Sequence, residues 1–167
     1  MKSVVIYSGG LDSTVLLYKL AAEGALAAAL SVDYGQRHAK ELEFAAANCK
    51  RLGVAHSVAD LSGIAHVFGG NALTDKSVDV PDGAYAESNM SATVVPNRNM
   101  ILLSLATARA IAIGADAVAY AAHGGDHALY ADCTPEFADA MGRAIELADY
   151  KKSNYCDLLL ILQKRTL

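Results

Sequence analysis

The sequence predicts an α/β fold, a mostly parallel sheet sandwiched between helices. Short strand-like runs alternate with helix-like segments along the whole chain. The strand-like runs are continuously apolar, which is typical of parallel strands buried on both faces. With 167 residues and a hydrophobic fraction of 53%, the chain suits one domain with a substantial core.

Each expected element has a local signal. The strand-like runs are apolar or β-branched and are bounded by turn residues; they cover residues 3–7, 28–33, 54–61 and 116–122. The helix-like segments cover residues 11–23, about 38–52, 97–113 and 134–148. Gly24, Gly53 and Gly114 follow three of these segments as stops. Thr134 is the expected N-cap of the last helix, with Pro135 at its first position.

One long segment, residues 62–95, lacks a clear period. It contains Gly-Gly at 69–70, Pro-Asp-Gly at 81–83 and many small polar residues. A loop of this length in a compact domain favours a functional lid or a partner surface. A disordered insertion is the alternative.

Composition limits the partners and the compartment. The net charge is −4 and no Lys/Arg block occurs, so no nucleic-acid partner is indicated. No apolar stretch is long enough for a bilayer and the start lacks a signal-peptide pattern, so we expect a cytoplasmic protein without a membrane partner. Cys49, Cys133 and Cys156 form no CxxC pair, which disfavours a disulfide scaffold or a structural zinc site.

The stretch SGGLDST at residues 8–14 follows the first strand and opens the first helix. Glycines let a ligand approach the main chain, and a helix N-terminus carries partial positive charge. Together they form a cradle for phosphate or pyrophosphate, to which Ser8, Ser13 and Thr14 add hydroxyl groups. The Walker A and GxGxxG patterns are both missing at this loop.

Asp12 is the odd residue in this loop, because a carboxylate repels phosphate unless a cation lies between them. We therefore interpret Asp12 as a ligand for Mg²⁺, directly or through water. A helix cap and a solvent-facing carboxylate are the alternatives.

SGGLDS after an apolar strand resembles the PP-loop of the N-type ATP pyrophosphatases. Three further blocks resemble one branch of them, the 7-cyano-7-deazaguanine synthases of queuosine biosynthesis; they are VDYGQRHAKELEFA (32–45), VVPNRNMILLSLA (94–106) and HGGDHALYADCTPEFADAM (123–141). The chain is identified as a member of that family. The resemblance implies a five-stranded, mostly parallel sheet of the adenine-nucleotide hydrolase-like (Rossmann-like) type, in a three-layer sandwich.

The resemblance also implies a reaction. An ATP-dependent ligase of this family forms C–N bonds, converting 7-carboxy-7-deazaguanine and ammonia to 7-cyano-7-deazaguanine with ATP and Mg²⁺. Adenylation of the carboxylate, amide formation and a second activation that permits dehydration are the implied steps. A homodimer is the implied assembly.

Roles for individual residues follow from matching the blocks. The implied ATP-binding residues are Tyr7, Ser8, Gly9, Gly10, Leu11, Asp12, Ser13, Thr14, Val15, Leu16 and Leu17, with Val32 and Asp33 on the adenosine side. The catalytic candidates are Asp12, Arg37, His38 and Arg98. Arg37 and His38 could neutralise phosphate charge or simply be a solvated helix start, and Arg98 is a donor fork for phosphate or carboxylate.

Substrate contacts are expected from a second group of residues. Asn99 either hydrogen-bonds substrate or caps its helix. A carboxylate can accept two hydrogen bonds from a guanine-like edge, and which aspartate does so stays open. The candidates are Asp126, Tyr130 and Asp132, with His123 and His127 as weaker ones.

The sequence departs from the family pattern in three places. Ala131 stands where the family usually has Pro, and Thr134 where it usually has Arg. We find no resemblance after about Tyr150, so we expect a PP-loop domain at 1–150 and a divergent tail at 151–167. The family's four-cysteine zinc site has no counterpart, so we expect no zinc ligands here. A non-catalytic remnant that binds nucleotide, or another PP-loop amidation or thiolation, is the alternative function.

Overall fold

The computed structural model describes residues 1–34, 39–68, 95, 97–122, 130–148 and 159–161. Its strands are β1 (Ser3–Ile6), β2 (Leu26–Asp33), β3 (Ala55–Asp60), β4 (Ala117–Tyr120) and β5 (Leu159–Ile161). Its α-helices are α1 (Leu11–Ala22), α2 (Ala39–Leu52), α4 (Arg98–Ile113) and α5 (Pro135–Ala148). Two 3₁₀ helices are η1 (Ser62–Phe68) and η2 (Ala131–Cys133).

The strands form one sheet in the order β3-β2-β1-β4-β5, and every neighbouring pair is parallel. Four strands form the body of the sheet, and the short β5 adds a fifth beside β4. This confirms the α/β class and the parallel sheet. The fifth strand comes from the segment beyond residue 150 that the sequence set apart.

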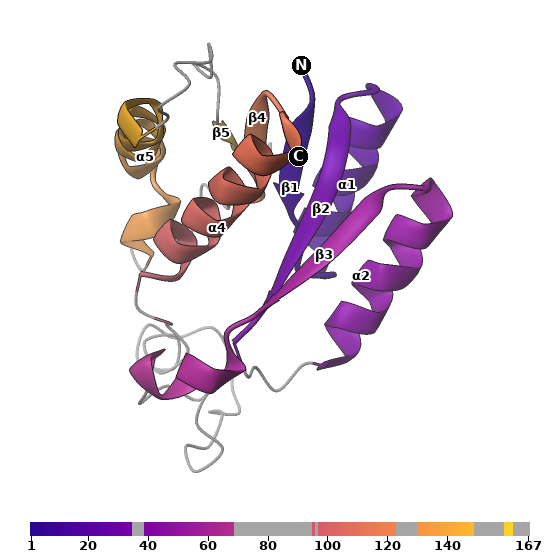
Figure 1. The fold of residues 1–167 in the computed structure, drawn as a ribbon, viewed down its shortest axis with the longest axis horizontal. Helices are drawn as coiled ribbons and strands as arrows, with labels where there is room; N and C mark the ends of the chain where they lie inside the picture. The colour runs from indigo at the N-terminus through magenta and orange to yellow at the C-terminus, as the bar shows by residue number, and fades with distance from the viewer. Residues whose placement is uncertain (35–38, 69–94, 96, 123–129, 149–158, 162–167) are drawn as a thin grey trace, which may run out of the picture.

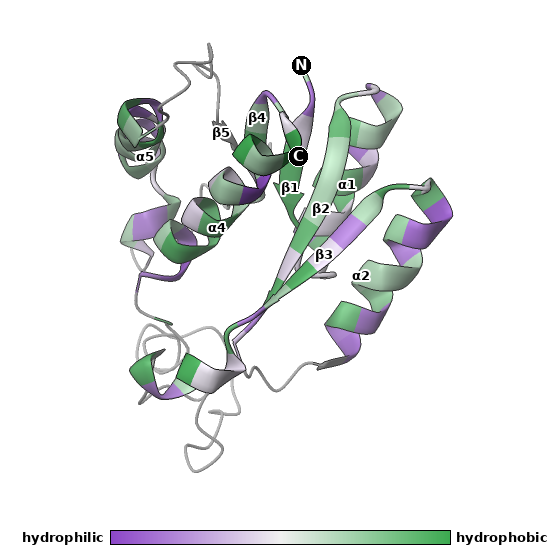
Figure 2. Cartoon of the chain, in the orientation of Figure 1, coloured by the Kyte–Doolittle hydropathy of each residue, from purple (hydrophilic) through white to green (hydrophobic). Residues whose placement is uncertain are grey.

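Helices cover both faces of the sheet (Figure 1): α1 and α2 lie on one side, and α4 and α5 on the other. Neighbouring β1 residues point to opposite faces, as the period of a strand requires. Val4 joins the core under α4 and α5 with Leu103 and Val118. Val5 joins the core under α1 and α2 with Leu17. Figure 2 shows these central strands coloured as mostly hydrophobic, whereas hydrophilic residues are frequent on α2.

Several boundaries differ from the predicted ones. β2 begins at Leu26 rather than 28, because Leu26 and residues 28–30 pair with β1 and this pairing overrides the helix preference of alanine. β4 ends at Tyr120, within the predicted 116–122. Part of the segment expected to be irregular is the 3₁₀ helix η1, whose start is held by the amide of Ser62 donating to Asp60 Oδ1 at 2.8 Å. The rest of that segment lies outside the described residues, except Val95.

The chain order places a topological switch beside β1. From β1 the chain winds outward through β2 to β3, and it then returns through α4 to β4 on the other side of β1. In parallel sheets ligands bind at the carboxyl ends of strands, near such a reversal. The loop after β1 lies at that place. Among the described residues no helix is both long and apolar enough to cross a membrane.

Candidate active site

The carboxyl edge of the sheet gathers most of the predicted site residues that the structure describes. The glycine loop leaves β1 there and enters α1, and β2 ends there at Asp33. The start of α4 reaches the same edge, because α4 returns the chain from the carboxyl end of β3 to the amino end of β4. η2 is tied to the start of α4 by hydrogen bonds. Segments far apart in sequence therefore face one region.

Gly9 is the tightest point of the loop. Its φ is +88°, a left-handed value that suits glycine. A Cβ on Gly9 would lie 2.1 Å from the carbonyl oxygen of Glu41 in α2. Gly9 is therefore required twice, for its conformation and for the close approach of α2.

The loop is closed by a ring of hydrogen bonds. The amide of Gly10 donates to Ser8 Oγ at 3.2 Å, and Ser13 Oγ donates to the carbonyl of Gly10 at 3.0 Å. Ser8 Oγ and Ser13 Oγ lie 3.1 Å apart. Each hydroxyl has a single proton, so Ser8 donates to Ser13. In this arrangement both serine protons bind within the loop, which leaves backbone amides at the helix start to face an anion.

A second set of hydrogen bonds reaches the Gly10 carbonyl through Thr14. Thr14 Oγ1 donates to the carbonyl of Gly10 at 2.8 Å, and it lies 3.1 Å from the hydroxyl of Tyr7. Asn48 Nδ2 donates to that hydroxyl at 2.8 Å, and Tyr18 donates to Asn48 Oδ1 at 3.2 Å. Sequence reasoning missed Asn48 and Tyr18, because nothing in a linear pattern links residues so far apart to the loop.

The backbone of Tyr7 is fixed as well. Ser31 Oγ in β2 donates to the carbonyl of Tyr7 at 2.5 Å, and His56 Nε2 lies 2.8 Å from the same Oγ. Because the Ser31 proton is used, His56 Nε2 is the donor in that contact. Burial lowers the pKa of His56, which favours its neutral form.

Other members of the predicted ATP-binding span have different surroundings. The side chains of Leu16 and Leu17 are fully buried in the core, so they support the loop rather than line it. Leu11 and Val15 are exposed on the outer side of α1, with 75% and 54% of their surface accessible. Asp12 lies in the first turn of α1 and is partly exposed.

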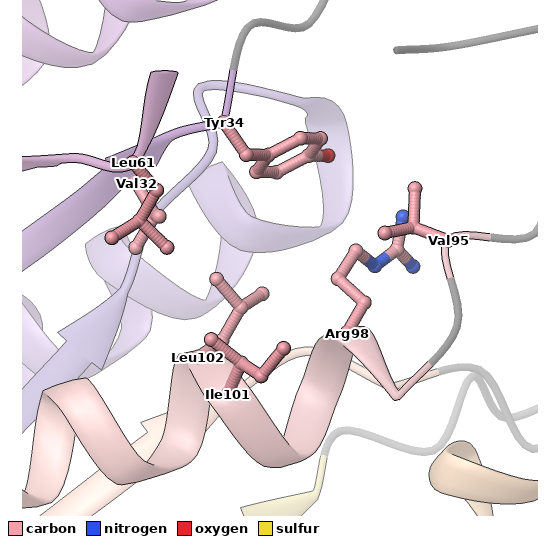
Figure 3. A pocket seen from close by; sticks show the side chains of 7 residues that line it. All are labelled: Val32, Tyr34, Leu61, Val95, Arg98, Ile101 and Leu102. Carbon is pink, nitrogen blue, oxygen red and sulfur yellow. The ribbon is translucent and has the colours of Figure 1, made fainter. Parts of the chain in front are cut away.

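A shallow pocket, partly open to solvent, lies beside the ends of β2 and β3 (Figure 3). Tyr34 faces Ile101 and Leu102 of α4 across it, and the Arg98 side chain extends from the first turn of α4 toward Val95. Val32 and Leu61 complete the lining. The pocket thus brings together Val32, expected on the adenosine side, and Arg98, expected as a donor fork for phosphate or carboxylate, with an aromatic ring that the sequence had not singled out.

Asn99 and Asp132, both predicted to touch substrate, contact each other. The amide of Asn99 donates to Asp132 Oδ2 at 2.9 Å, and Asn99 Nδ2 donates to the carbonyl of Asp132 at 3.1 Å and to Cys133 Sγ at 3.2 Å. Asp132 therefore caps the start of α4 from outside the helix. Tyr130 lies just before η2, half-buried against the same core.

Tyr120 ends β4 directly below this cluster. Its hydroxyl is buried and has no hydrogen-bond partner in the described parts of the chain. Burial, with smaller contributions from Cys133 and Asp132, raises the pKa of Tyr120 to about 12. The phenol is thus neutral near pH 7.

Three predicted residues, Arg37, His38 and Asp126, lie outside the described residues, as do His123 and His127. Among the residues that are described, no three His, Cys, Asp or Glu side chains cluster as metal ligands.

Comparisons with known proteins show the family of the chain. The family model described as "Queuosine biosynthesis protein QueC" matches residues 2–165, which extends past residue 150, where the sequence analysis found the resemblance to end. A protein named 7-cyano-7-deazaguanine synthase from Psychromonas ingrahamii is 52% identical over 151 residues, covering 90% of this chain and 68% of its own.

Two rhizobial proteins of the same name are also similar. The one from Rhizobium meliloti is 55% identical, covering 96% of this chain and 66% of its own, and the one from Rhizobium rhizogenes is 59% identical, covering 84% and 59%. The chain thus spans about two thirds or less of the length of these relatives. With a family model matched over nearly the whole chain and a glycine loop at the expected place in the sheet, the chain belongs to the QueC family of queuosine biosynthesis proteins.

Proposed function

We propose that this chain makes 7-cyano-7-deazaguanine from 7-carboxy-7-deazaguanine, ammonia and ATP. The relatives carry the name of that synthase. The observation that carries the proposal is Gly9, held in a left-handed conformation against α2 at the switch point of the sheet. A loop of this shape at a helix N-terminus suits the pyrophosphate that such a reaction releases.

In this proposal the adenosine part of ATP lies against the shallow pocket at the end of β2. The pocket is lined mostly by apolar side chains and one aromatic ring, which suits a flat base. Arg98 at its edge provides a fork of donors for a phosphate or an activated carboxylate that needs charge compensation.

The residues of the loop fit Mg²⁺ as a companion of ATP. Mg²⁺ keeps several waters and uses one or two carboxylates together with substrate phosphates, so it needs no dedicated cage of side chains. Asp12 in the first turn of α1 supplies one carboxylate. When bound, the ion would neutralise phosphate charge at this turn.

The proposed reaction requires activation of the substrate carboxylate and does not require a nucleophile from the protein. A carboxylate is a poor electrophile, and adenylation attaches AMP to one oxygen while pyrophosphate leaves. Ammonia then displaces AMP to give an amide, and a second adenylation, at the amide oxygen, lets AMP leave as the C≡N bond forms with loss of two protons. In this proposal the loop amides hold the phosphates and Arg98 stabilises negative charge that develops at the reacting phosphate.

The direct test uses the purified 167-residue chain with ATP, Mg²⁺, ammonium and 7-carboxy-7-deazaguanine. Mass spectrometry should detect the nitrile, and pyrophosphate release should require the acid. Asp12→Asn should reduce product formation by at least about tenfold, as expected for the loss of a charged contact at the metal and phosphates. Lys50→Ala, an exposed change on α2, is the matched control.

Two results would argue against the proposal. Pyrophosphate release that continues unchanged without the acid would indicate a different acceptor. A folded chain that binds ATP but forms neither amide nor nitrile would support the alternative of a nucleotide-binding protein without this reaction.

A further inference from the structure

We propose that Asn48 of α2 is a positioning residue for the phosphate-binding loop. The inference rests on the proposed function, because it requires that ATP phosphates bind at the loop. It concerns the bonds that run from Tyr18 through Asn48, Tyr7 and Thr14 to the carbonyl of Gly10; we call these five residues the relay.

The relay has one direction. Thr14 gives its only hydroxyl proton to the carbonyl of Gly10, so it must accept from Tyr7. Tyr7 has then used its own proton and must accept from the amide of Asn48. Asn48 Oδ1 is left to accept from Tyr18, as observed. An amide suits this place, because its oxygen accepts and its nitrogen donates from the same carbon.

The end of the relay is the peptide between Gly10 and Leu11. A peptide unit is planar and trans, so the direction of the Gly10 carbonyl also fixes the direction of the Leu11 amide. That amide opens α1 and has no intrahelical acceptor, and it points away from the helix toward the anion site. Asn48 therefore acts on the phosphate site through three intervening hydrogen bonds.

The position of the relay supports a role beyond filling space. Tyr7 is fully buried and α2 makes a second contact with the loop where Glu41 meets Gly9. α2 thus holds both ends of the loop's first turn, Gly9 through the backbone and Gly10 through the relay. Such preorganisation raises affinity by lowering the ordering cost that the ligand would otherwise meet.

A purely structural role is the competing explanation, because a buried phenol needs a partner in any protein. The two roles differ when both partners are removed. Replacing a hydrogen-bonded pair by apolar groups of similar shape can be nearly neutral for stability. It would still remove the bonds from Asn48 and Tyr7 that orient the Thr14 hydroxyl on the Gly10 carbonyl.

The experiment therefore compares Asn48→Leu, Tyr7→Phe and the double variant with the unsubstituted chain. ATP affinity is measured by calorimetric titration with ATP and Mg²⁺, and stability by urea unfolding. Asn48→Leu and the double variant should bind ATP about three- to tenfold more weakly, the range expected for one neutral hydrogen bond. The double variant should be close to the unsubstituted chain in stability and should remain weak in ATP binding.

Cys49→Ala is the matched control. Cys49 is the next residue of α2, buried in the same core and outside the relay. It should lower stability without changing ATP affinity.

Three results would overturn the inference. The first is a double variant that binds ATP as tightly as the unsubstituted chain. The second, which applies if the double variant does not fold, is a folded Asn48→Leu variant that does so. The third is a Cys49→Ala variant whose ATP affinity falls as much as that of Asn48→Leu. If the unsubstituted folded chain itself fails to bind ATP, the proposed function fails at its first step, which is a different result from all three.

Discussion

Gly9 differs from the other described glycines with a left-handed backbone in how closely a neighbouring helix approaches it. The three other described glycines with positive φ, Gly24, Gly53 and Gly114, have no atom within 4 Å of an added Cβ. Gly9 alone of these four would collide with a neighbouring helix. We expect Gly9→Ala to destabilise the chain by about 3 kcal/mol, from backbone strain plus displacement of α2. Urea unfolding measures this change.

Gly24→Ala is the matched control for Gly9→Ala. It imposes a similar left-handed strain at φ +65° without a clash, so its cost should be about 1 kcal/mol. Gly9→Ala should also weaken ATP binding, whereas Gly24→Ala should not. Equal destabilisation by both substitutions would mean that α2 yields easily and that the close approach carries little energy.

Tyr120 should make the free energy of unfolding depend on pH. Its pKa is raised from 10.0 to about 12, mainly by burial. Between these two values the unfolded chain loses the phenol proton while the folded chain keeps it, so the free energy of unfolding falls as the pH rises. The loss should reach about 2 kcal/mol at pH 12 and level off near about 3 kcal/mol above that pH, and well below pH 10 this tyrosine should contribute no pH dependence.

Tyr120→Phe should remove this part of the alkaline slope in urea unfolding at several pH values. It should cost little stability near pH 7, because the hydroxyl lacks a partner among the described residues. An unchanged alkaline slope would show that other groups dominate. A large loss near pH 7 would show that the hydroxyl does have a partner.

Helix ends that carry a local signal were predictable from the sequence. The sequence placed stops at Gly24, Gly53 and Gly114, and the structure has all three in the left-handed conformation just after their helices. The expected cap of α5 is confirmed by the amide of Phe137 donating to Thr134 Oγ1 at 3.1 Å. These signals are local, since each involves residues within a single turn.

The start of α4 was not predictable in the same way. Asn97 has a φ of 57° and makes no side-chain cap, and the helix is instead capped by Asp132 from a later segment. A contact between residues 99 and 132 leaves no trace in a local pattern. The sequence identified both side chains, Asp132 as a substrate contact and Asn99 as a substrate contact or a helix cap, and in the structure they bind each other.

A substitution at Asp132 separates these two roles. Asp132→Asn keeps an oxygen that can accept from the amide of Asn99, whereas Asp132→Ala removes it. We expect a loss of about 1–2 kcal/mol in unfolding free energy for Asp132→Ala and less than half of that for Asp132→Asn, as for other helix caps. If both variants are as stable as the unsubstituted chain, Asp132 does not hold α4, and the role in substrate binding gains support.

The arrangement of the whole sheet decides which site residues could be predicted from the sequence. The glycine loop and the end of β2 were predicted together because parallel strands bring their carboxyl ends to one edge. Asn48 and Tyr18 were missed because their contact depends on how α1 and α2 pack on one face of the sheet, and Tyr34 was missed because its neighbours lie on α4. Packing between layers is a property of the whole fold, and single-sequence patterns carry little of it.

The sheet topology predicts which backbone amides a bound nucleotide should protect from hydrogen exchange. ATP at the carboxyl edge should slow amide hydrogen exchange in residues 7–14 and 97–102, which are distant in sequence but lie on one edge of the sheet. The turns at Gly24, Gly53 and Gly114 lie at the opposite edge and serve as internal controls. Hydrogen exchange with mass spectrometry, with and without ATP and Mg²⁺, measures both.

The pattern of protection distinguishes local binding from general stabilisation. Any ligand that binds only the folded chain stabilises it globally by mass action, so slow-exchanging core amides can change throughout. Exchange by local opening, as at loops and helix ends, changes only near the ligand. Protection of residues 7–14 without change at the three glycine turns would locate the nucleotide at the carboxyl edge. Equal protection at both edges would contradict that placement, and with it the assignment of the glycine loop as the phosphate site.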